Sequence, residues 1–255
     1  MRKMLSWPAE RIASSLATLP RKKIRSAVAD KSAAVLLPLC LDARLRPSVL
    51  CCVRAPKLRS HAGEICFPGG RREPQDTSDA AAALRETEEE LGLPPSRVEV
   101  LGELPPILSN RRMAVTPVVG LVTGDGPGGS LTPASLVLER GEVAAAFTVD
   151  LEHLLAPSTL KFHDVVVPRE SVPMRIPAFV LAPELARTLP YAEGQERPKH
   201  APTDEVAIWG LTGFILHTFL SLEALGLGLA ASESVDMSSH ALGRDDTEWR
   251  DSGSA

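Results

Sequence analysis

The 255-residue sequence has no surplus of positive charge. Its 28 Lys and Arg residues stand against 32 Asp and Glu residues, which leaves a formal net charge of −4 at pH 7. A nucleic-acid-binding protein needs a basic surface to contact phosphates, so the composition indicates no nucleic-acid partner. The sequence has 44% hydrophobic and 24% charged residues, a composition that also excludes a collagen-like, coiled-coil or globally disordered chain. The length suits one enlarged domain or two small ones.

Cysteine is scarce, and its spacing forms no disulfide framework. The four cysteines (Cys40, Cys51, Cys52 and Cys66) fall in one stretch and make no CxxC pair. Adjacent Cys51 and Cys52 would point to opposite faces of a strand. We therefore expect reduced, mostly packed thiols in an intracellular protein.

Secretory and membrane-spanning segments are also missing from the pattern. Residues 1–20 lack a long apolar core, and the apolar stretch 211–231 has Glu223 near its middle, where a charge costs at least ~2.5 kcal/mol. The basic, serine-bearing segment 1–32 suits either a mitochondrial presequence or an amphipathic surface helix that begins the domain. The last three residues are a poor peroxisomal signal. We expect a mitochondrial or cytoplasmic location, with a peroxisomal one less favoured.

Strands and helices are interleaved along the chain without a strict β-α-β-α alternation. The patterns predict strands at 33–39, 49–53, 98–104, 114–122, 143–149 and 176–181, with helices at 78–91 and 211–225. This order predicts an α/β or α+β fold, with a mixed sheet covered by helices. We expect one domain over 33–230 and a disordered tail over 231–255, which is polar and acidic.

The segment 85–93 reads Arg-Glu-Thr-Glu-Glu-Glu-Leu-Gly-Leu. In a helix, residues three and four apart share a face, so Glu86, Glu89 and Glu90 should converge while Glu88 points elsewhere. Three like charges on one face repel each other, and a bound divalent cation would turn that repulsion into affinity. Carboxylate oxygens suit Mg²⁺ or Mn²⁺. The alternative interpretation of the run alone is a solvated acidic helix face.

The surrounding residues favour the metal site. Upstream lie Phe67-Pro68-Gly69-Gly70 and then Asp76, ahead of Arg85 and the glutamates. This order resembles the Nudix box, whose usual form is Gly, five residues, Glu, seven residues, then Arg-Glu-apolar-any-Glu-Glu-any-Gly-apolar. Here Asp76 replaces the first Glu, and eight residues instead of seven separate it from Arg85. Thr87 takes the apolar position. The resemblance implies a Nudix-type α-β-α sandwich with a mixed sheet.

A second pattern directly precedes the box. It runs from Arg54-Ala55 through Arg59 and Gly63, at three-residue intervals, to the Phe-Pro-Gly-Gly turn. It resembles the signature of the coenzyme A diphosphatase branch of Nudix hydrolases, in which a box longer by one residue is common. The later segments 115–120, 142–155 and 208–213 are similar to landmarks of the same branch. The resemblance covers roughly residues 33–225.

The resemblance implies a role for each site residue. The metal ligands are Glu86, Glu89, Glu90 and the carbonyl of Gly70, while Arg85 orients the carboxylates. Glu86 is ligand or general base, and Asp204 or Glu205 from a late loop is the alternative base. The implied substrate contacts are Arg54, Arg59, Gly69 and Gly70. Arginine suits this role because its guanidinium group can donate two hydrogen bonds to phosphate oxygens. Further basic candidates are Lys57, Arg111 and Arg112.

The implied activity is metal-dependent hydrolysis of the diphosphate bond of coenzyme A or an acyl-coenzyme A. The products would be 3′,5′-ADP and 4′-phosphopantetheine, acylated where the substrate is a thioester. Two alternatives remain open: a Nudix hydrolase for another nucleoside diphosphate derivative, such as ADP-ribose or a dinucleotide, and a catalytically silent Nudix-fold binding module. We expect a small-molecule substrate and a monomer or homodimer.

Overall fold

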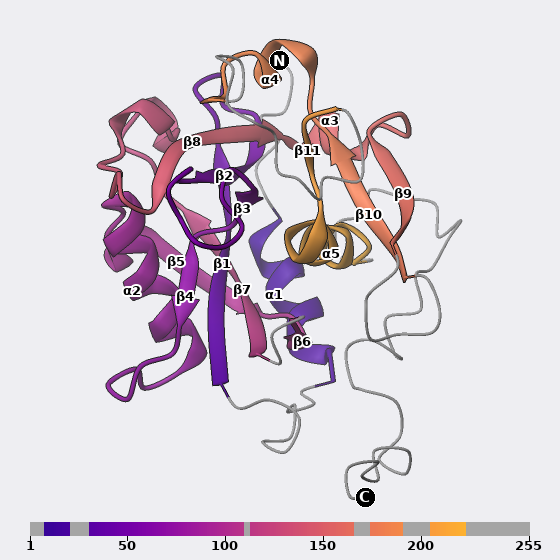
Figure 1. The fold of residues 1–255 in the computed structure, drawn as a ribbon. Helices are drawn as coiled ribbons and strands as arrows, with labels where there is room; N and C mark the ends of the chain where they lie inside the picture. The colour runs from indigo at the N-terminus through magenta and orange to yellow at the C-terminus, as the bar shows by residue number, and fades with distance from the viewer. Residues whose placement is uncertain (1–7, 21–30, 110–112, 166–173, 191–204, 223–255) are drawn as a thin grey trace, which may run out of the picture.

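The computed structural model describes residues 8–20, 31–109, 113–165, 174–190 and 205–222 (Figure 1). The expected tail over 231–255 lies outside these residues, as do Arg111, Arg112 and Asp204. No helix in the described ranges has both the length and the apolar character needed to cross a membrane.

A mixed eight-stranded sheet forms the centre of the fold. Strand β1 (Lys31–Leu41) runs antiparallel to β2 (Pro47–Arg54) and parallel to β7 (Met113–Val122). The strand order is β3-β2-β1-β7-β5, while β4 also pairs with β1, β6 with β7 and β8 with β2. The bounds of these further strands are β3 (Ile65–Cys66), β4 (Gly69–Arg71), β5 (Val98–Glu103), β6 (Ile107–Leu108) and β8 (Val143–Asp150).

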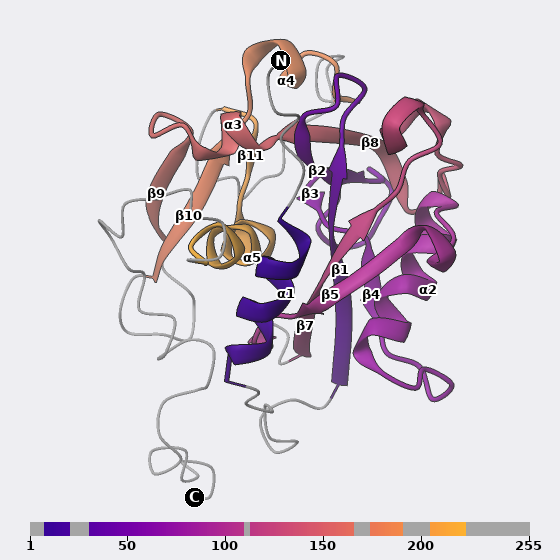
Figure 2. The same cartoon turned by 180° about the vertical axis from the view of Figure 1, so that it is seen from behind.

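Helix α2 (Asp79–Leu91) covers one face of this sheet (Figures 1 and 2). Ser78 caps its first turn by accepting a hydrogen bond from the Ala81 amide at 3.0 Å. Gly92 ends it at a φ of 63°, the left-handed conformation that glycine adopts without strain. The fully buried Ala82 and Ala83 let the helix backbone approach the sheet closely. The helix predicted over 78–91 is confirmed.

The opposite face is covered by α1 (Ala9–Thr18) and α5 (Gly210–Leu220). Ile12 and Leu16 of α1 are buried in the same hydrophobic core as the apolar face of α5. Figure 2 shows α1 and α5 to the left of the sheet strands β1, β5 and β7, and α2 to their right. Helices on both faces of a mixed sheet make an α-β-α sandwich, so the predicted fold class is confirmed.

A second, three-stranded antiparallel sheet extends the face that carries α5. Its order is β11-β10-β9, and α5 packs against β10. The bounds of the elements in this part of the chain are α3 (Leu151–Leu155), β9 (Leu160–Val165), β10 (Met174–Val180), α4 (Pro183–Ala186) and β11 (Ala207–Ile208).

The cysteines are packed as the sequence predicts. Cys51 lies in the core cluster beneath α1 and α5, whereas Cys40 and Cys52 lie in a separate cluster with Leu91. Neighbouring residues of β2 therefore do face opposite sides of the sheet. None of the four thiols is in a disulfide, and burial raises the pKa of the Cys66 thiol to about 12.

Candidate active site

The two glycines of β4 bring the backbone against the acidic face of α2. The Gly69 amide donates a hydrogen bond to Oε2 of Glu90 at 3.1 Å. A Cβ atom on Gly70 would lie only 2.4–2.5 Å from the Glu86 carboxylate, so any side chain there would displace it. The sequence-predicted residues Gly69, Gly70, Glu86 and Glu90 are thus brought together.

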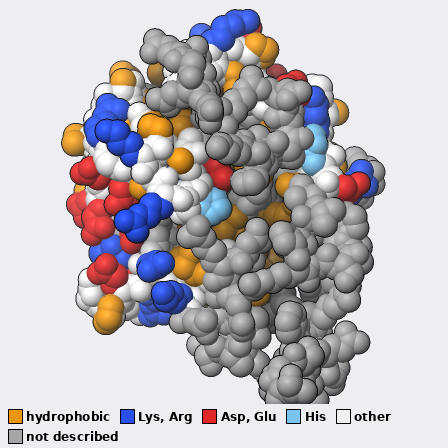
Figure 3. All heavy atoms as spheres, viewed as in Figure 1, with side chains coloured by type: hydrophobic (Ala, Val, Ile, Leu, Met, Phe, Trp, Pro, Cys, Tyr) orange, Lys and Arg blue, Asp and Glu red, His pale blue; other side chains and the backbone are white. Residues whose placement is uncertain are grey.

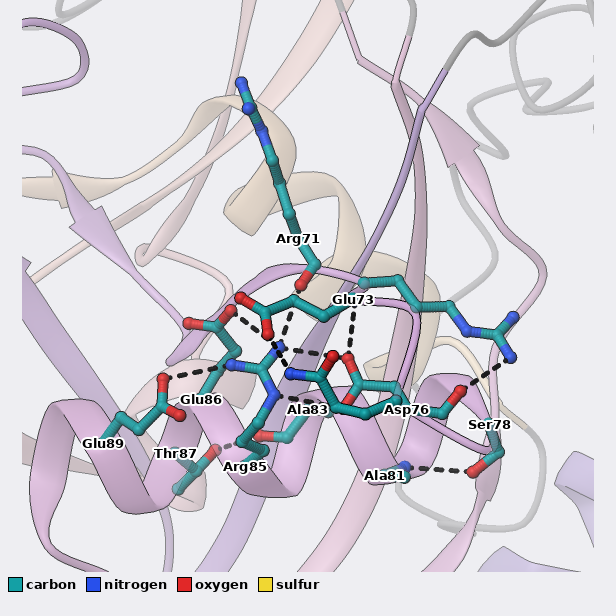
Figure 4. Close-up of polar contacts among 12 residues, drawn as sticks. Arg71, Glu73, Asp76, Ser78, Ala81, Ala83, Arg85, Glu86, Thr87 and Glu89 are labelled. Carbon is teal, nitrogen blue, oxygen red and sulfur yellow. Dashed lines mark hydrogen bonds and ion pairs between the residues drawn. The ribbon is translucent and has the colours of Figure 1, made fainter.

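Arg85 is the centre of the polar network at the start of the acidic face (Figure 4). Its Nε and Nη2 donate to the two carboxylate oxygens of Asp76, each at 3.1 Å, and Nη1 donates to Glu89 at 3.0 Å. Nη2 also lies 3.1 Å from Glu86 Oε1 and donates to the Arg71 carbonyl at 3.0 Å. One guanidinium therefore fixes three carboxylates and the strand that leads from Gly70.

Two departures from the usual box have a structural account. Asp76, in the position of the first box glutamate, reaches Arg85 through both oxygens, and the hydrogen bond from Arg85 lowers the pKa of its carboxyl group. Thr87, in the apolar position, is fully buried and donates its hydroxyl hydrogen to the Ala83 carbonyl at 2.6 Å. Its polar group is satisfied within the helix, so the threonine packs against the sheet without an unpaired donor.

Burial and like charge act together on the acidic residues of α2. Glu90 is only 4% exposed, and burial raises the pKa of its carboxyl group to about 7, with further contributions from Glu142 and Glu86. Burial also raises the pKa of Glu86, which is repelled by Glu89 and Glu142. Carboxylates near one another in a half-buried site favour a bound cation that offsets their charge.

Glu142 is a site residue to which the sequence analysis assigned no role. It lies directly before β8, and its carbonyl accepts a hydrogen bond from the Ala55 amide at 2.8 Å. This contact places it beside the end of β2 and close enough to act electrostatically on Glu86 and Glu90. The only signal in the sequence was the similarity of the Glu142-Val143 pair to a family landmark.

The donor chemistry fits a hard divalent cation. Carboxylate oxygens from Glu86, Glu89 and Glu90, with Glu142 nearby, are the ligands that Mg²⁺ and Mn²⁺ prefer. Within the described ranges, no three His, Cys, Asp or Glu side chains are gathered closely enough to hold an ion. The carboxylates are held apart by other contacts: Glu89, whose side chain is 59% exposed, forms an ion pair with Arg85, and Glu90 accepts a hydrogen bond from the Gly69 amide.

The predicted substrate contacts Arg54 and Arg59 and the alternative base Glu205 lie in different surroundings. Arg54 is half-buried at the end of β2, where its charge acts on Glu90 and on the Cys66 thiol. Its buried Nε atom has no hydrogen-bond partner among the described residues. Arg59 is exposed in the loop between β2 and β3. Glu205 is exposed ahead of β11 and pairs with Lys161 of β9, in the second sheet.

Comparison with known proteins identifies the family. A protein-family model described as "NUDIX domain" matches residues 31–169, which is more than half of the chain. The chain therefore belongs to the Nudix hydrolase family. Members of this family generally use divalent metal ions such as Mg²⁺ or Mn²⁺.

Bacterial relatives share this part of the sequence. A Photorhabdus laumondii protein named "Uncharacterized Nudix hydrolase NudL" is 42% identical over 147 residues, covering 58% of this chain and 73% of the relative. A Yersinia pestis protein of the same name is 39% identical over 149 residues, covering 58% and 68%. Among solved structures, the Nudix hydrolase RenU from M. smegmatis matches 49% of this chain and 73% of its own, with 22% identity and a TM-score of 0.39. That likeness is too distant to bear on the site.

The metal-free protein should lose stability as the pH rises from about 4.5 to about 7, because burial raises the pKa of Glu90 across that interval. Between these two pH values the Glu90 carboxyl group is protonated in the folded protein and ionised in the unfolded chain. The stabilisation that comes from the protonated group is therefore full below about pH 4.5 and lost above about pH 7. A pKa shift of this size corresponds to a difference of about 3 kcal/mol in the free energy of unfolding. Urea unfolding in EDTA at several pH values measures it.

Glu90→Gln is the matched variant for this measurement. Its amide oxygen can still accept the hydrogen bond from Gly69, but it has no proton to release, so its pH dependence should be flatter than that of the wild type by the same amount. Identical pH profiles for the two proteins would contradict the assignment to Glu90.

Proposed function

We propose that the protein hydrolyses the diphosphate bond of coenzyme A or its thioesters. The products are 3′,5′-ADP and 4′-phosphopantetheine, acylated where the substrate is an acyl-coenzyme A. The observation that carries the proposal is the joining of two motifs. The arm from Arg54 to Phe67 leads through β3 and β4 directly onto the acidic face of α2. A diphosphate with a further ribose phosphate fits a site with acidic and basic groups side by side.

In this proposal Glu86, Glu89, Glu90 and the Gly70 carbonyl hold the Mg²⁺ or Mn²⁺ ions. A metal held there would offset charge on the diphosphate oxygens and would lower the pKa of a water molecule for in-line attack at phosphorus. Arg85 keeps Glu86 and Glu89 in place by the contacts described above. Nε of Arg54, which is buried and has no hydrogen-bond partner among the described residues, would supply a donor for a phosphate oxygen, and Arg59 adds a second cation on the loop.

Proton transfer completes the reaction. The attacking water gives its oxygen to one phosphorus, the bond from that phosphorus to the bridging oxygen breaks, and the second phosphate leaves. We assign the proton of the water to a carboxylate oxygen of Glu86, which lies against Gly70 and 3.1 Å from Nη2 of Arg85. Glu205 is the alternative base; its ion pair with Lys161 in the second sheet would have to open for this role.

The test is a product assay on a small panel of diphosphates. Purified protein with Mg²⁺ or Mn²⁺ should release 3′,5′-ADP from coenzyme A, detected by liquid chromatography. Equal or better turnover of ADP-ribose, NADH or a dinucleotide would overturn the substrate assignment and favour another Nudix activity. A calorimetric titration with Mn²⁺ addresses the third possibility, because a protein that binds no divalent ion is a silent binding module.

A further inference from the structure

Arg71 is the last residue of β4 and directly follows Gly70. Its backbone is fixed in two ways. It pairs with Ala33 in the β1–β4 ladder, and its carbonyl accepts the hydrogen bond from Arg85. The Cα atom of Arg71 is therefore held at a set position beside the acidic face of α2, and the direction of its side chain follows from the strand.

The side chain of Arg71 leaves the strand away from α2. Successive residues of a strand point to opposite faces, and the Cβ position of Gly70 faces Glu86. Figure 4 accordingly shows Arg71 extended away from the helix, opposite to the network around Arg85. The guanidinium is thus anchored next to the site without joining its carboxylates.

Among the described residues, the side chain of Arg71 differs from those of its basic neighbours in having no partner. Arg72 pairs with Asp79 and donates to the Asp76 carbonyl, and Arg85 holds three carboxylates. The exposed guanidinium of Arg71 makes no hydrogen bond or ion pair with any residue that the structure describes. At the left of Figure 3, where Figure 1 places α2, Lys and Arg side chains (blue) lie beside Asp and Glu side chains (red).

We propose that Arg71 is a specificity-determining residue that binds a phosphate carried by the substrate outside the hydrolysed diphosphate. This inference rests on the proposed function, in which that group is the 3′-phosphate on the ribose of coenzyme A. In the proposed site the hydrolysed diphosphate would lie at the carboxylates of Glu86 and Glu90, on the other face of Gly70. Because Arg71 extends away from those carboxylates, a phosphate that it binds would belong to a flanking part of the substrate. A guanidinium donates two parallel hydrogen bonds to a phosphate, which suits this task.

Equilibrium binding of two nucleotides to the full chain tests the proposal. Adenosine 3′,5′-bisphosphate carries the additional phosphate, and 5′-AMP lacks it. By calorimetry with Mg²⁺, Arg71→Gln should weaken binding of the bisphosphate about 10-fold or more, the usual loss for a charge-assisted hydrogen bond, and leave 5′-AMP unchanged. Arg71→Lys should retain an intermediate affinity. In kinetics, Arg71→Gln should raise KM for coenzyme A but not for dephospho-coenzyme A, with kcat nearly unchanged for both.

Arg44→Gln is the matched control, because Arg44 is also an exposed arginine and lies in the turn between β1 and β2. An equal loss in this variant would mean that only the general charge matters, and would overturn the proposal. Equal weakening of both nucleotides by Arg71→Gln, or wild-type protein that does not prefer the bisphosphate, would overturn it as well. Wild-type protein that prefers the bisphosphate through Arg71 but does not hydrolyse coenzyme A would sink the proposed function and leave the assignment of Arg71 intact.

Discussion

Glu86→Gln should lower kcat with Mg²⁺ by about 10³-fold, because a metal that stabilises transition-state charge contributes several kcal/mol and Glu86 is one of its ligands in the proposed site. Glu86 contacts Arg85 and lies against the Gly70 backbone, so the amide keeps the shape but loses the charge. The metal-free melting temperature should stay constant or rise, since burial and repulsion already disfavour the charged form of Glu86. Steady-state kinetics and calorimetric melting in EDTA measure the two effects.

Glu88→Gln is the control for this prediction. Glu88 is an exposed residue on the same helix, two positions along, and it has no ion pair among the described residues. Its substitution should change kcat less than about twofold, as expected for a surface charge away from the site. If Glu86→Gln unfolded the protein, or if both variants kept full activity, the acidic face would be a structural or solvated surface.

Alanine substitutions at the two glycines of β4 should separate stability from activity. At Gly69, φ is +150° and a Cβ would lie 2.4 Å from the Ala34 carbonyl oxygen, so Gly69→Ala should destabilise the fold by more than about 1 kcal/mol. At Gly70 the Cβ would meet the flexible end of Glu86 instead of backbone. Gly70→Ala should therefore leave the protein folded but displace the carboxylate and lower kcat/KM about 100-fold or more.

Chemical denaturation and steady-state kinetics on both variants check this contrast. Gly63→Ala is less suitable as a control because Gly63 also has a positive φ, of 73°. Gly141→Ala is a better one, since a Cβ there would meet only the end of the Glu139 side chain, at 3.2 Å. A stable, fully active Gly70→Ala protein would mean that the position of Glu86 beside β4 has no bearing on catalysis.

The elements that could be predicted from the sequence are those with strong local signals. Helix α2 has a serine cap, a glycine end and small buried residues on one face, and the structure places it within a residue of the predicted bounds. The long strands β1 and β7 are apolar runs that need no tertiary context to be recognised. The strands β3, β4, β6 and β11 were missed because each has only two or three residues, too few to show an alternating pattern. The six-residue strand β9 was missed as well.

The parts of the site that were missed depend on pairing between distant segments. Glu142 approaches Glu90 because β8 pairs with β2, with Val143 opposite Arg54. The effect of Arg54 on Glu90 likewise depends on the β2–β3 ladder that positions the end of β2. No short-range pattern reports such contacts, so the sequence analysis gave Glu142 no role and did not place Arg54 beside Glu90.

The parallel pairing of β1 with β7 has a consequence for how the site is assembled. Leu36 lies opposite Val118, and the whole of α2 belongs to the crossover that joins these two strands. The middle of the sheet therefore closes only when that crossover is docked, a non-local step of the kind that slows folding. Partly folded chains should consequently lack metal affinity altogether. The capacity to bind an ion should appear together with slow amide exchange in β1 and β7, as one cooperative event during maturation of the enzyme.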